Sequence, residues 1–254
     1  MSGLKIEEFW NLGFYSYPFY RFVVESYCLQ SLKKKRCVMF DAGCGSNVCS
    51  LSKVPENTTV IGLDINRKSI YSCHQAAKRK GYRNFHYLIG SLTHLPLISS
   101  IFDICICIDV LEHLPNKDNA IAEISRVCKL KATFIGSTSN SLNPILLFDS
   151  TAPKVLVKPL AEKFAPGHYE RHKRLNPKKL KRLLEKHGFH AQSIKLLGFP
   201  PFQPWLYHFR ERKIPIYAYF WILFDKITNR TLLNTLKEVI IFNAVKTKNQ
   251  KQSS

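Results

Sequence analysis

Short apolar runs alternate with amphipathic stretches through the middle of the chain. The apolar runs predict five strands, at 37–42, 58–64, 84–90, 102–109 and 131–138. The stretches between them predict helices near 46–53, at 66–80 and at 117–129. Because strands that alternate with helices form parallel sheets, this pattern predicts an α/β fold with a doubly wound sheet.

The alternation ends after Asn140, and the next clear element is a helix at 176–187. Asn176 is its expected N-cap, Pro177 stands in its first turn, and Gly188 ends it. The leucines of this helix share one face, and its Lys and Arg residues form an opposite face that we interpret as solvated.

Two further strand-like runs, 189–197 and 239–245, enclose a segment rich in proline and aromatic residues. We interpret the chain as one domain with additions, since 254 residues that are 45% hydrophobic can bury a substantial core. The interpretation comprises an aromatic helical cover at 1–36, a domain at 37–247 with elaborations at about 141–174 and 198–236, and a disordered tail at 248–254.

Positive charge is concentrated in the second part of the chain. The formal net charge is +20; residues 1–150 hold 17 Lys and Arg against 12 Asp and Glu, whereas residues 151–254 hold 21 against 6. Such a field attracts RNA, anionic lipid or a phosphorylated substrate, or it only keeps the protein in solution. The eight cysteines include no Cys-x-x-Cys pair, and the N-terminus carries Glu7 and Glu8 in place of a signal peptide's basic start. We therefore expect a reduced, cytoplasmic protein.

The first predicted strand runs directly into a glycine-rich turn, Asp41-Ala42-Gly43-Cys44-Gly45. The glycines allow a sharp turn and bring a ligand against bare backbone. Asp64 ends the second strand, where a carboxylate either accepts both hydroxyls of a ribose or caps the next helix. Val48 stands where a dinucleotide fingerprint has its third glycine, so the turn predicts a nucleoside-like ligand other than a dinucleotide.

Four segments in order resemble the motifs of class I S-adenosylmethionine-dependent methyltransferases. They are Phe40–Gly45, Gly62–Ile65, Gly90–Leu97 and Phe102–Leu114. The resemblance covers residues 37–140 and, more loosely, the helix at 176–187. It implies a Rossmann-like doubly wound sheet, mostly parallel with an antiparallel last strand, and S-adenosylmethionine as the cofactor.

The resemblance also implies roles for single residues around the cofactor. The methionine part would contact Asp41, Gly43 and Gly45, the ribose hydroxyls Asp64, the adenine Ile65, Ser91 and Leu92, and the end of the fourth strand would contribute Asp109, Val110 and Leu111.

Two positions depart from the pattern of this family. Asn47 stands where a third glycine is usual, although asparagine tolerates a left-handed backbone better than most residues. Ser91 stands where an acidic residue usually binds the adenine amino group, and a hydroxyl accepts that bond more weakly than a carboxylate. These departures motivate one alternative, a non-catalytic cofactor-binding or scaffold protein.

His113 is the candidate catalytic residue because a histidine near the transferred methyl group could deprotonate a hydroxyl acceptor. The alternative is that His113 only shapes its loop. Asp109, Glu112 and His113 also match the spacing of a metal cluster in some quinone-pathway relatives, but without a fourth ligand we predict no metal site.

Two segments are candidates for contact with the acceptor. His168 and Arg171 precede the helix at 176–187 and either meet an anionic acceptor or are ordinary loop residues. The aromatic and basic segment 205–230 forms a lid over the acceptor, a dimer contact, or an element that faces an anionic membrane; its apolar run at 214–224 is too short to span a bilayer.

We therefore predict an S-adenosylmethionine-dependent methyltransferase that acts on a small or lipid-like acceptor by O- or C-methylation, with peripheral contact with an anionic membrane. An RNA methyltransferase is the other enzymatic alternative, favoured by the basic second part of the chain. Against it, no recognisable RNA-binding module and no Asn/Asp-Pro-Pro-aromatic motif follows the fourth strand.

Overall fold

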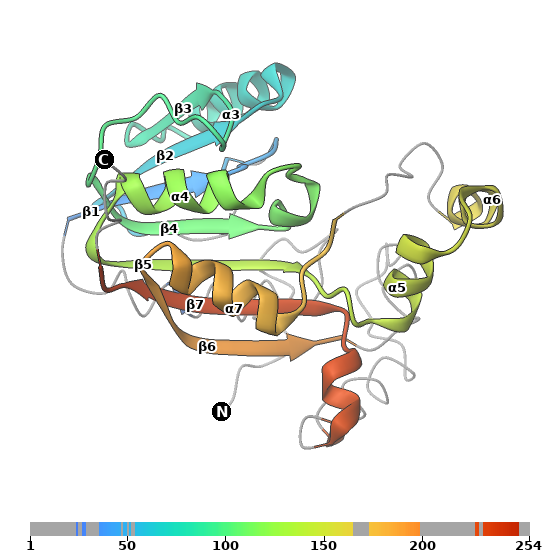
Figure 1. Cartoon of the computed structure of the whole chain (residues 1–254). Coiled ribbons are helices and arrows are strands. Elements are labelled where there is room, and N and C mark those ends of the chain that lie inside the picture. The colour runs from blue at the N-terminus through green and yellow to red at the C-terminus, as the bar shows by residue number, and fades with distance from the viewer. Residues whose placement is uncertain are drawn as a thin grey trace.

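Seven strands form one mixed sheet in the order β3-β2-β1-β4-β5-β7-β6 (Figure 1). The computed structural model describes residues 24, 27–28, 36–46, 48–49, 51, 54–164, 173–198, 227–228 and 231–248. The strands are β1 (Cys37–Ala42), β2 (Thr58–Asp64), β3 (Phe85–Ile89), β4 (Phe102–Ile108), β5 (Cys128–Ser139), β6 (Phe189–Leu197) and β7 (Val239–Lys246). From β3 to β5 all neighbours are parallel, and β7 runs antiparallel to both β5 and β6. The predicted fold class, including the antiparallel last strand, is confirmed.

Five α-helices with described bounds accompany the sheet. They are α3 (Arg67–Arg79), α4 (Lys117–Val127), α5 (Pro144–Thr151), α6 (Lys154–Phe164) and α7 (Pro177–Lys186). In Figure 1, α4 and α7 lie across one face of the sheet, whereas α5 and α6 lie beyond the ends of its strands. α5 and α6 fall in the segment 141–174, where the sequence shows no clear period. Within the described residues, no helix is long and apolar enough to cross a bilayer.

Local sequence signals set the ends of α3 and α7. Asn66 caps α3 by accepting hydrogen bonds from the backbone N–H groups of Lys68 and Ser69 at 2.9 and 3.3 Å. Asn176 caps α7 in the same way, and Gly188 follows α7 with a φ of +81°, which a glycine adopts without strain.

The expected helix near 46–53 is not present among the described residues of that segment, which form a turn and bends. Backbone groups there are held by other partners: the Val48 carbonyl accepts a hydrogen bond from the Tyr87 hydroxyl at 2.5 Å, and the Leu51 N–H donates to the Cys49 thiol at 3.4 Å. These contacts with β3 and within the loop replace the helical hydrogen bonds, so the prediction is wrong for this segment.

Two apolar clusters cover the two faces of the sheet. On one face, Leu180 and Leu184 of α7 and Ile121 of α4 pack with Phe134 and Phe242 of the sheet, all fully buried. The other face carries a second cluster, whose members include Val24, Cys28, Met39, Cys49, Leu51 and Ile104. All eight cysteines are buried and no disulfide joins them, as expected for core thiols.

The chain order of the strands creates a crevice at one edge of the sheet. The chain passes from β1 outward through β2 to β3, and then returns to place β4 on the other side of β1. Ligands of doubly wound sheets bind where the order reverses, outside the carboxyl ends of the strands. The carboxyl ends of β1 and β4 meet at this point, followed by the glycine-rich turn and by Asp109.

Candidate functional site

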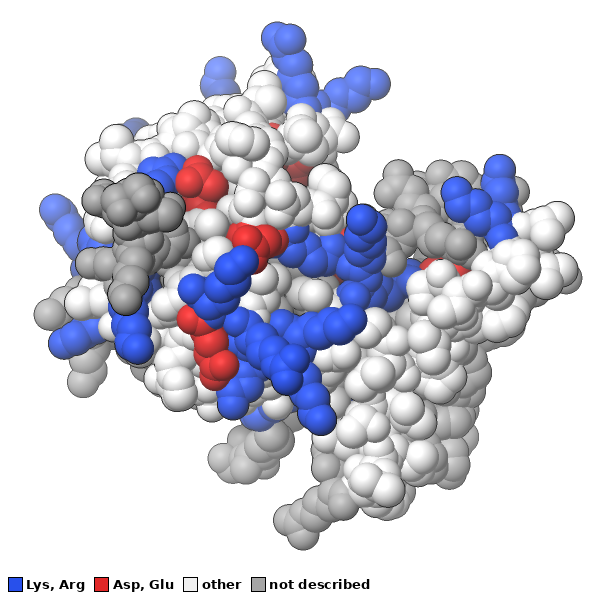
Figure 2. Space-filling view, viewed as in Figure 1, with Lys and Arg blue, Asp and Glu red and all other residues white. Residues whose placement is uncertain are grey.

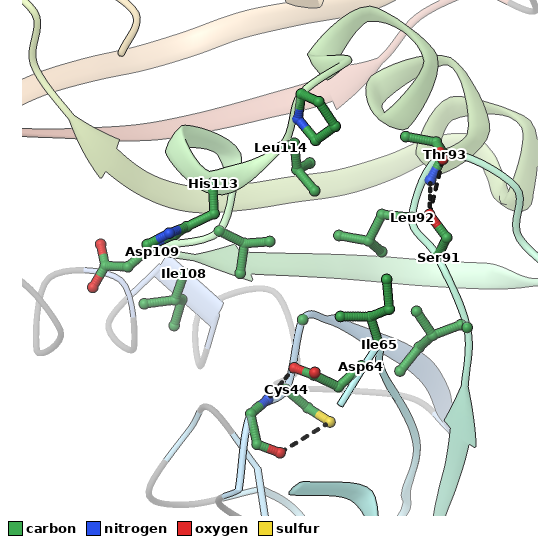
Figure 3. A pocket seen from close by; sticks show the side chains of 16 residues that line it. Cys44, Asp64, Ile65, Ser91, Leu92, Thr93, Ile108, Asp109, His113 and Leu114 are labelled. Carbon is green, nitrogen blue, oxygen red and sulfur yellow. Dashed lines mark hydrogen bonds between the residues drawn. The ribbon is translucent and has the colours of Figure 1, made fainter. Parts of the chain in front are cut away.

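A cavity of about 480 Å³ opens at this edge, above the ends of β1, β2 and β4 (Figure 3). It brings together most of the residues singled out from the sequence. Its lining includes Gly43, Gly45, Asp64, Ile65, Ser91, Leu92, Asp109, Val110 and His113. Asp41 and Leu111 do not line it: Asp41 is buried and hydrogen-bonded with the Cys49 thiol, and Leu111 is part of the apolar core.

The glycine-rich turn forms one wall of the cavity. Gly43 and Gly45 have φ angles of +79° and +63°, in the left-handed region that favours glycine. The N–H groups of Gly43 and Cys44 both donate to the Leu63 carbonyl, at 2.8 and 3.1 Å. A Cβ on Gly43 would lie 2.5 Å from Val110 Cγ2, whereas a Cβ on Gly45 would meet nothing within 4 Å. Gly43 therefore permits close packing, and Gly45 leaves the wall open to a ligand.

Asp64 joins the turn to the start of α3. Its Oδ2 accepts a hydrogen bond from the Gly45 N–H at 2.9 Å, and its Oδ1 accepts one from the Asn66 N–H at 2.8 Å. Because Asn66 caps α3, the alternative of Asp64 as the helix cap is excluded. A carboxylate has about four acceptor positions, so Asp64 retains capacity to accept two hydroxyl donors from a ligand.

Two thiol groups form hydrogen bonds with the backbone of the glycine-rich turn. Cys73 of α3 and Cys44 both donate to the Gly45 carbonyl, at 3.2 and 3.8 Å. The hydrogen bond with Cys73, together with burial, raises the pKa of the Cys44 thiol, so it stays protonated. No sequence pattern connects Cys73 with the site, because the contact depends on how α3 packs.

Ser91 lies on the opposite wall from the turn, and its hydroxyl is already engaged. It accepts a hydrogen bond from the Thr93 N–H at 3.3 Å and lies 2.8 Å from the Thr93 hydroxyl (Figure 3). Thr93 also lines the cavity and was not singled out from the sequence. Near this wall, Ile65 is 77% exposed, which leaves an apolar side chain available to a flat ligand.

Asp109 and His113 lie at the other end of the cavity from Ser91 (Figure 3). Asp109 has a φ of +54°, and the Ser137 hydroxyl donates to its Oδ1 at 2.7 Å. A 3₁₀ helix, Leu111–His113, then carries His113 to the cavity. A non-glycine residue in this conformation requires support from its surroundings, and the bonds with Ser137 supply it.

Glu112 points away from the cavity into the protein. Its carboxylate accepts hydrogen bonds from the Thr138 hydroxyl at 2.9 Å and the Ser139 N–H at 3.1 Å. Burial raises the pKa of Glu112. Its neighbours Asp109 and His113 line the cavity while Glu112 does not, and within the described residues no three acidic, His or Cys side chains are arranged to hold a metal ion.

The site fits a nucleoside that carries a polar chain. The glycine-rich turn forms a wall of bare backbone beside Asp64, whose carboxylate can accept further hydrogen bonds. The exposed apolar side chain of Ile65 lies near the polar turn of Ser91 and Thr93. At the switch point of a doubly wound sheet, with an antiparallel final strand, these features define an S-adenosylmethionine-binding methyltransferase fold.

Comparison with known proteins agrees with this class. The profile of a methyltransferase domain family matches residues 33–188. The chain is 22% identical over 178 residues to a ubiquinone biosynthesis O-methyltransferase of Azoarcus sp. (strain BH72), covering 70% of this chain and 73% of that protein. With the enzyme of the same name from Vibrio cholerae it is 23% identical, and the match spans 65% of each chain, slightly less than two thirds.

A solved structure shows the same fold. The S-adenosylmethionine-dependent methyltransferase from Methanosarcina mazei superposes with a TM-score of 0.60 at 17% sequence identity, covering 86% of this chain and 96% of that one. The chain belongs to the methyltransferase domain family. It is an S-adenosylmethionine-dependent methyltransferase.

Proposed function

We propose that the protein methylates a hydroxyl group of a small or lipid-like acceptor. The observation that carries the proposal is the cavity at the switch point, with the glycine turn and Asp64 at one side and His113 at the other. The names of the Azoarcus and Vibrio relatives, which are O-methyltransferases of ubiquinone biosynthesis, support oxygen as the methylated atom.

Different residues of the cavity would contact different parts of the cofactor. Gly43 and Gly45 would accommodate the methionine part against bare backbone, and Asp64 would accept hydrogen bonds from the ribose hydroxyls. Ile65 and Leu92 would flank the adenine, with Ser91 and Thr93 beside its polar edge. S-adenosylmethionine supplies a methyl group on a positively charged sulfur, so the protein's main task is to align the acceptor and exclude water.

Asp109, Val110 and His113 would border the reacting end of the cavity. His113 is the proposed proton acceptor for the acceptor hydroxyl, because it lines the cavity at the end away from the adenine wall (Figure 3). Asp41 and Leu111, which do not line the cavity, would act by supporting the strand ends rather than by contact.

The helices beyond the strand ends favour a lipid-like acceptor and contact with an anionic membrane. Leu147 and Phe148 of α5 are 46% and 51% exposed, and Val155 and Leu156 of α6 are 77% and 61% exposed. Lys154 and Lys158 lie exposed on the same helix, α6. Apolar area and attraction to anionic lipid add together in such an element. His168, Arg171 and Asn47 lie outside the described residues, as does the predicted lid or membrane segment 205–230 apart from residues 227–228.

RNA methylation is the second candidate, and one surface favours it. Lys and Arg side chains gather over α7 (Figure 2), where Lys178, Lys179 and Arg182 are exposed. Other basic residues of the helix are paired: Lys186 with Asp118 at 2.7 Å and Lys181 with Glu185 at 3.8 Å. An RNA affinity that falls steeply with salt would support this candidate over the lipid-like acceptor.

Calorimetric titration with S-adenosylmethionine tests the central proposal. We expect saturable binding by the wild-type protein and loss of it in Gly43→Val, with the wild-type fold retained by circular dichroism. Absence of binding by the folded wild-type protein would favour the scaffold alternative.

Flotation with vesicles that contain anionic lipid, at low and high salt, tests the membrane contact. Failure of the protein to float with the vesicles at low salt contradicts this contact.

A further inference from the structure

The cavity wall opposite the glycine-rich turn belongs to the loop that joins β3 to β4. Ser91, Leu92 and Thr93 of this loop line the cavity (Figure 3). The loop then turns back on itself, because the His94 N–H donates to the Ser91 carbonyl at 3.1 Å. The residues that follow His94 belong to neither strand, so contacts with the rest of the protein must fix their position.

Arg126, in the last turn of α4, binds the backbone of this loop. Its Nη2 donates to the Leu95 carbonyl at 3.1 Å, and its Nη1 donates to the Leu97 carbonyl at 2.8 Å and to the Ser99 hydroxyl at 3.3 Å. The other two hydrogen bonds go to Glu123, from Nε to Oε1 at 2.7 Å and from Nη2 to Oε2 at 2.8 Å. A guanidinium has five N–H donors in a fixed fork, so each donor of Arg126 has a partner.

Glu123 binds the same loop directly. Its Oε2 accepts a hydrogen bond from the Leu95 N–H at 2.8 Å. The hydrogen bonds with Arg126 lower the pKa of Glu123, against the opposing effect of burial, so the carboxylate is charged at neutral pH. One ion pair therefore holds Leu95 at both its N–H and its carbonyl.

The point at which the loop is held lies close to the cavity wall. Only His94 separates Leu95 from Thr93, which lines the cavity. Leu92 and Leu95 are 5% and 6% exposed, and both pack in the apolar cluster that includes Ile121 of α4. A displacement of Leu95 relative to α4 therefore moves the residues of the wall with it.

The contribution of this ion pair to geometry exceeds its contribution to stability. The side chains of Arg126 and Glu123 are 32% and 23% exposed, and ion pairs that water reaches add little to the stability of a fold. Their hydrogen bonds with the loop backbone instead fix direction, since a planar guanidinium loses little freedom for each hydrogen bond that it forms.

We propose that Arg126 and Glu123 are positioning residues for the cofactor, because they hold the loop wall against its nucleoside end. This inference rests on the proposed function, in which the adenine lies beside Ser91, Leu92 and Thr93. Neither Arg126 nor Glu123 lines the cavity, so both act through the loop. The affinity for the cofactor thus depends on an ion pair outside its binding site.

Calorimetric titration of the full chain with two ligands tests this role without turnover. The ligands are S-adenosylhomocysteine and 5′-methylthioadenosine, which lacks the amino-acid part. Arg126→Met keeps the apolar stem of the side chain and loses all five donors. We expect it to bind both ligands about tenfold more weakly than the wild type, a loss worth one hydrogen bond. The factor should be the same for both, because the loop faces the nucleoside that they share.

Lys129→Met is the matched control. Lys129 forms a partly exposed ion pair with Asp103 at 2.7 Å, at the starts of β5 and β4, whereas the cavity opens at the carboxyl ends of the parallel strands. This variant should keep the wild-type affinities, whatever stability it loses in urea denaturation. Arg126→Lys restores the charge beside Glu123 but not the fork, so its affinities should lie between those of Arg126→Met and the wild type.

The outcomes separate the positioning role from the proposed function. If the folded wild-type protein does not bind S-adenosylhomocysteine, the proposed function is wrong. If it does, the positioning role is overturned by wild-type affinity in Arg126→Met, by an equal loss in Lys129→Met, or by a loss confined to S-adenosylhomocysteine. Absence of 5′-methylthioadenosine binding by the wild type also overturns it, because the nucleoside wall would then contribute too little affinity. Should Arg126→Met not fold, Glu123→Gln takes its place with the same ligands and the same control.

Discussion

The edge of the sheet at which the cavity opens has two halves that differ in structure. Over β1 and β2 the site consists of backbone, two glycines with positive φ and one carboxylate that binds two backbone N–H groups. Beyond the ends of β5 and β7 the same edge carries side chains such as Arg174 and Glu238, which are held by separate segments. A wall of backbone accepts few substitutions, whereas a group of side chains can change through a single residue without disturbing the sheet. We therefore propose that the first half holds the cofactor and that acceptor preference is set outside it.

The largest effect is expected in the backbone half, from Gly43→Ala. The new Cβ would lie 2.5 Å from Val110 Cγ2 in a backbone with φ of +79°, so the turn must shift. We expect affinity for S-adenosylmethionine to fall about 100-fold or more by calorimetry. Gly81→Ala is the matched control, since Gly81 has a φ of +70° but open space around it: it should lose stability and keep its affinity. Equal loss in both variants would mean that the glycine turn is only structural.

His113→Gln tests the boundary between the two halves. If His113 takes the proton of a hydroxyl acceptor, kcat should fall about 100-fold, the lower end of the contribution of a positioned base, while the Kd for the cofactor stays unchanged. The measurement is methyl transfer to an alkyl-substituted phenol, a small acceptor with one hydroxyl group, under saturating cofactor. Unchanged kcat would leave His113 with a role in shaping its loop.

Asp64→Asn should have a smaller effect in the backbone half, a loss of about 30-fold in cofactor affinity. The amide keeps the shape of the side chain but replaces one acceptor oxygen with a donor, which faces either a ribose hydroxyl or a backbone N–H. Asp103→Asn is the control, because Asp103 also accepts from a backbone N–H, that of Val38 at 2.9 Å, at the start of β4 and away from the cavity. Similar affinities for Asp64→Asn and wild type would contradict ribose binding.

In the side-chain half, Glu238→Gln should increase stability above neutral pH. Burial and the negative charge of Asp109 raise the pKa of Glu238 to about 7, so the folded state holds a proton that the unfolded chain releases at lower pH. Stability is therefore lost as the pH rises towards 7, and the neutral amide avoids this loss. We expect an increase of about 1 kcal/mol in the free energy of unfolding at pH 8 and little change at pH 4, measured by urea denaturation. A decrease at pH 8 would indicate that the carboxylate stabilises the fold.

The smallest effect should come from Asp118, which belongs to neither half. Hydrogen bonding to Lys186, and then to His187, lowers the pKa of Asp118. A depressed pKa contributes stability above the unfolded value, and that contribution is lost as the pH falls below about 4. Because the pair is largely exposed, Asp118→Asn should cost about 0.5 kcal/mol at pH 7 and nothing at pH 2. A cost that persists at pH 2 would point to packing instead of charge.

The sequence predicted the backbone half well because its requirements are local. The glycine turn directly after one strand and Asp64 at the end of the next can be recognised from their spacing in the sequence. The structure brings both to one cavity. The N-cap Asn176 of α7 was predicted correctly because it acts within its own turn, whereas the cap of α3 is Asn66 and not Asp64, the residue considered from the sequence. The helix near 46–53 was wrong because Tyr87, on a distant strand, binds the Val48 carbonyl.

By itself, then, the sequence determined the fold class, the order of the strands along the chain, and the glycine-rich turn and Asp64 that line the cavity. These follow from apolar periodicity and from backbone conformations that few residue types allow. Only the tertiary structure decided that Glu112 faces the interior, that Cys73 supports the glycine turn, and that the segments of Arg174 and Glu238 both reach the end of β5. Such contacts join segments far apart in the chain, and side-chain burial and charge depend on neighbours that no local pattern specifies.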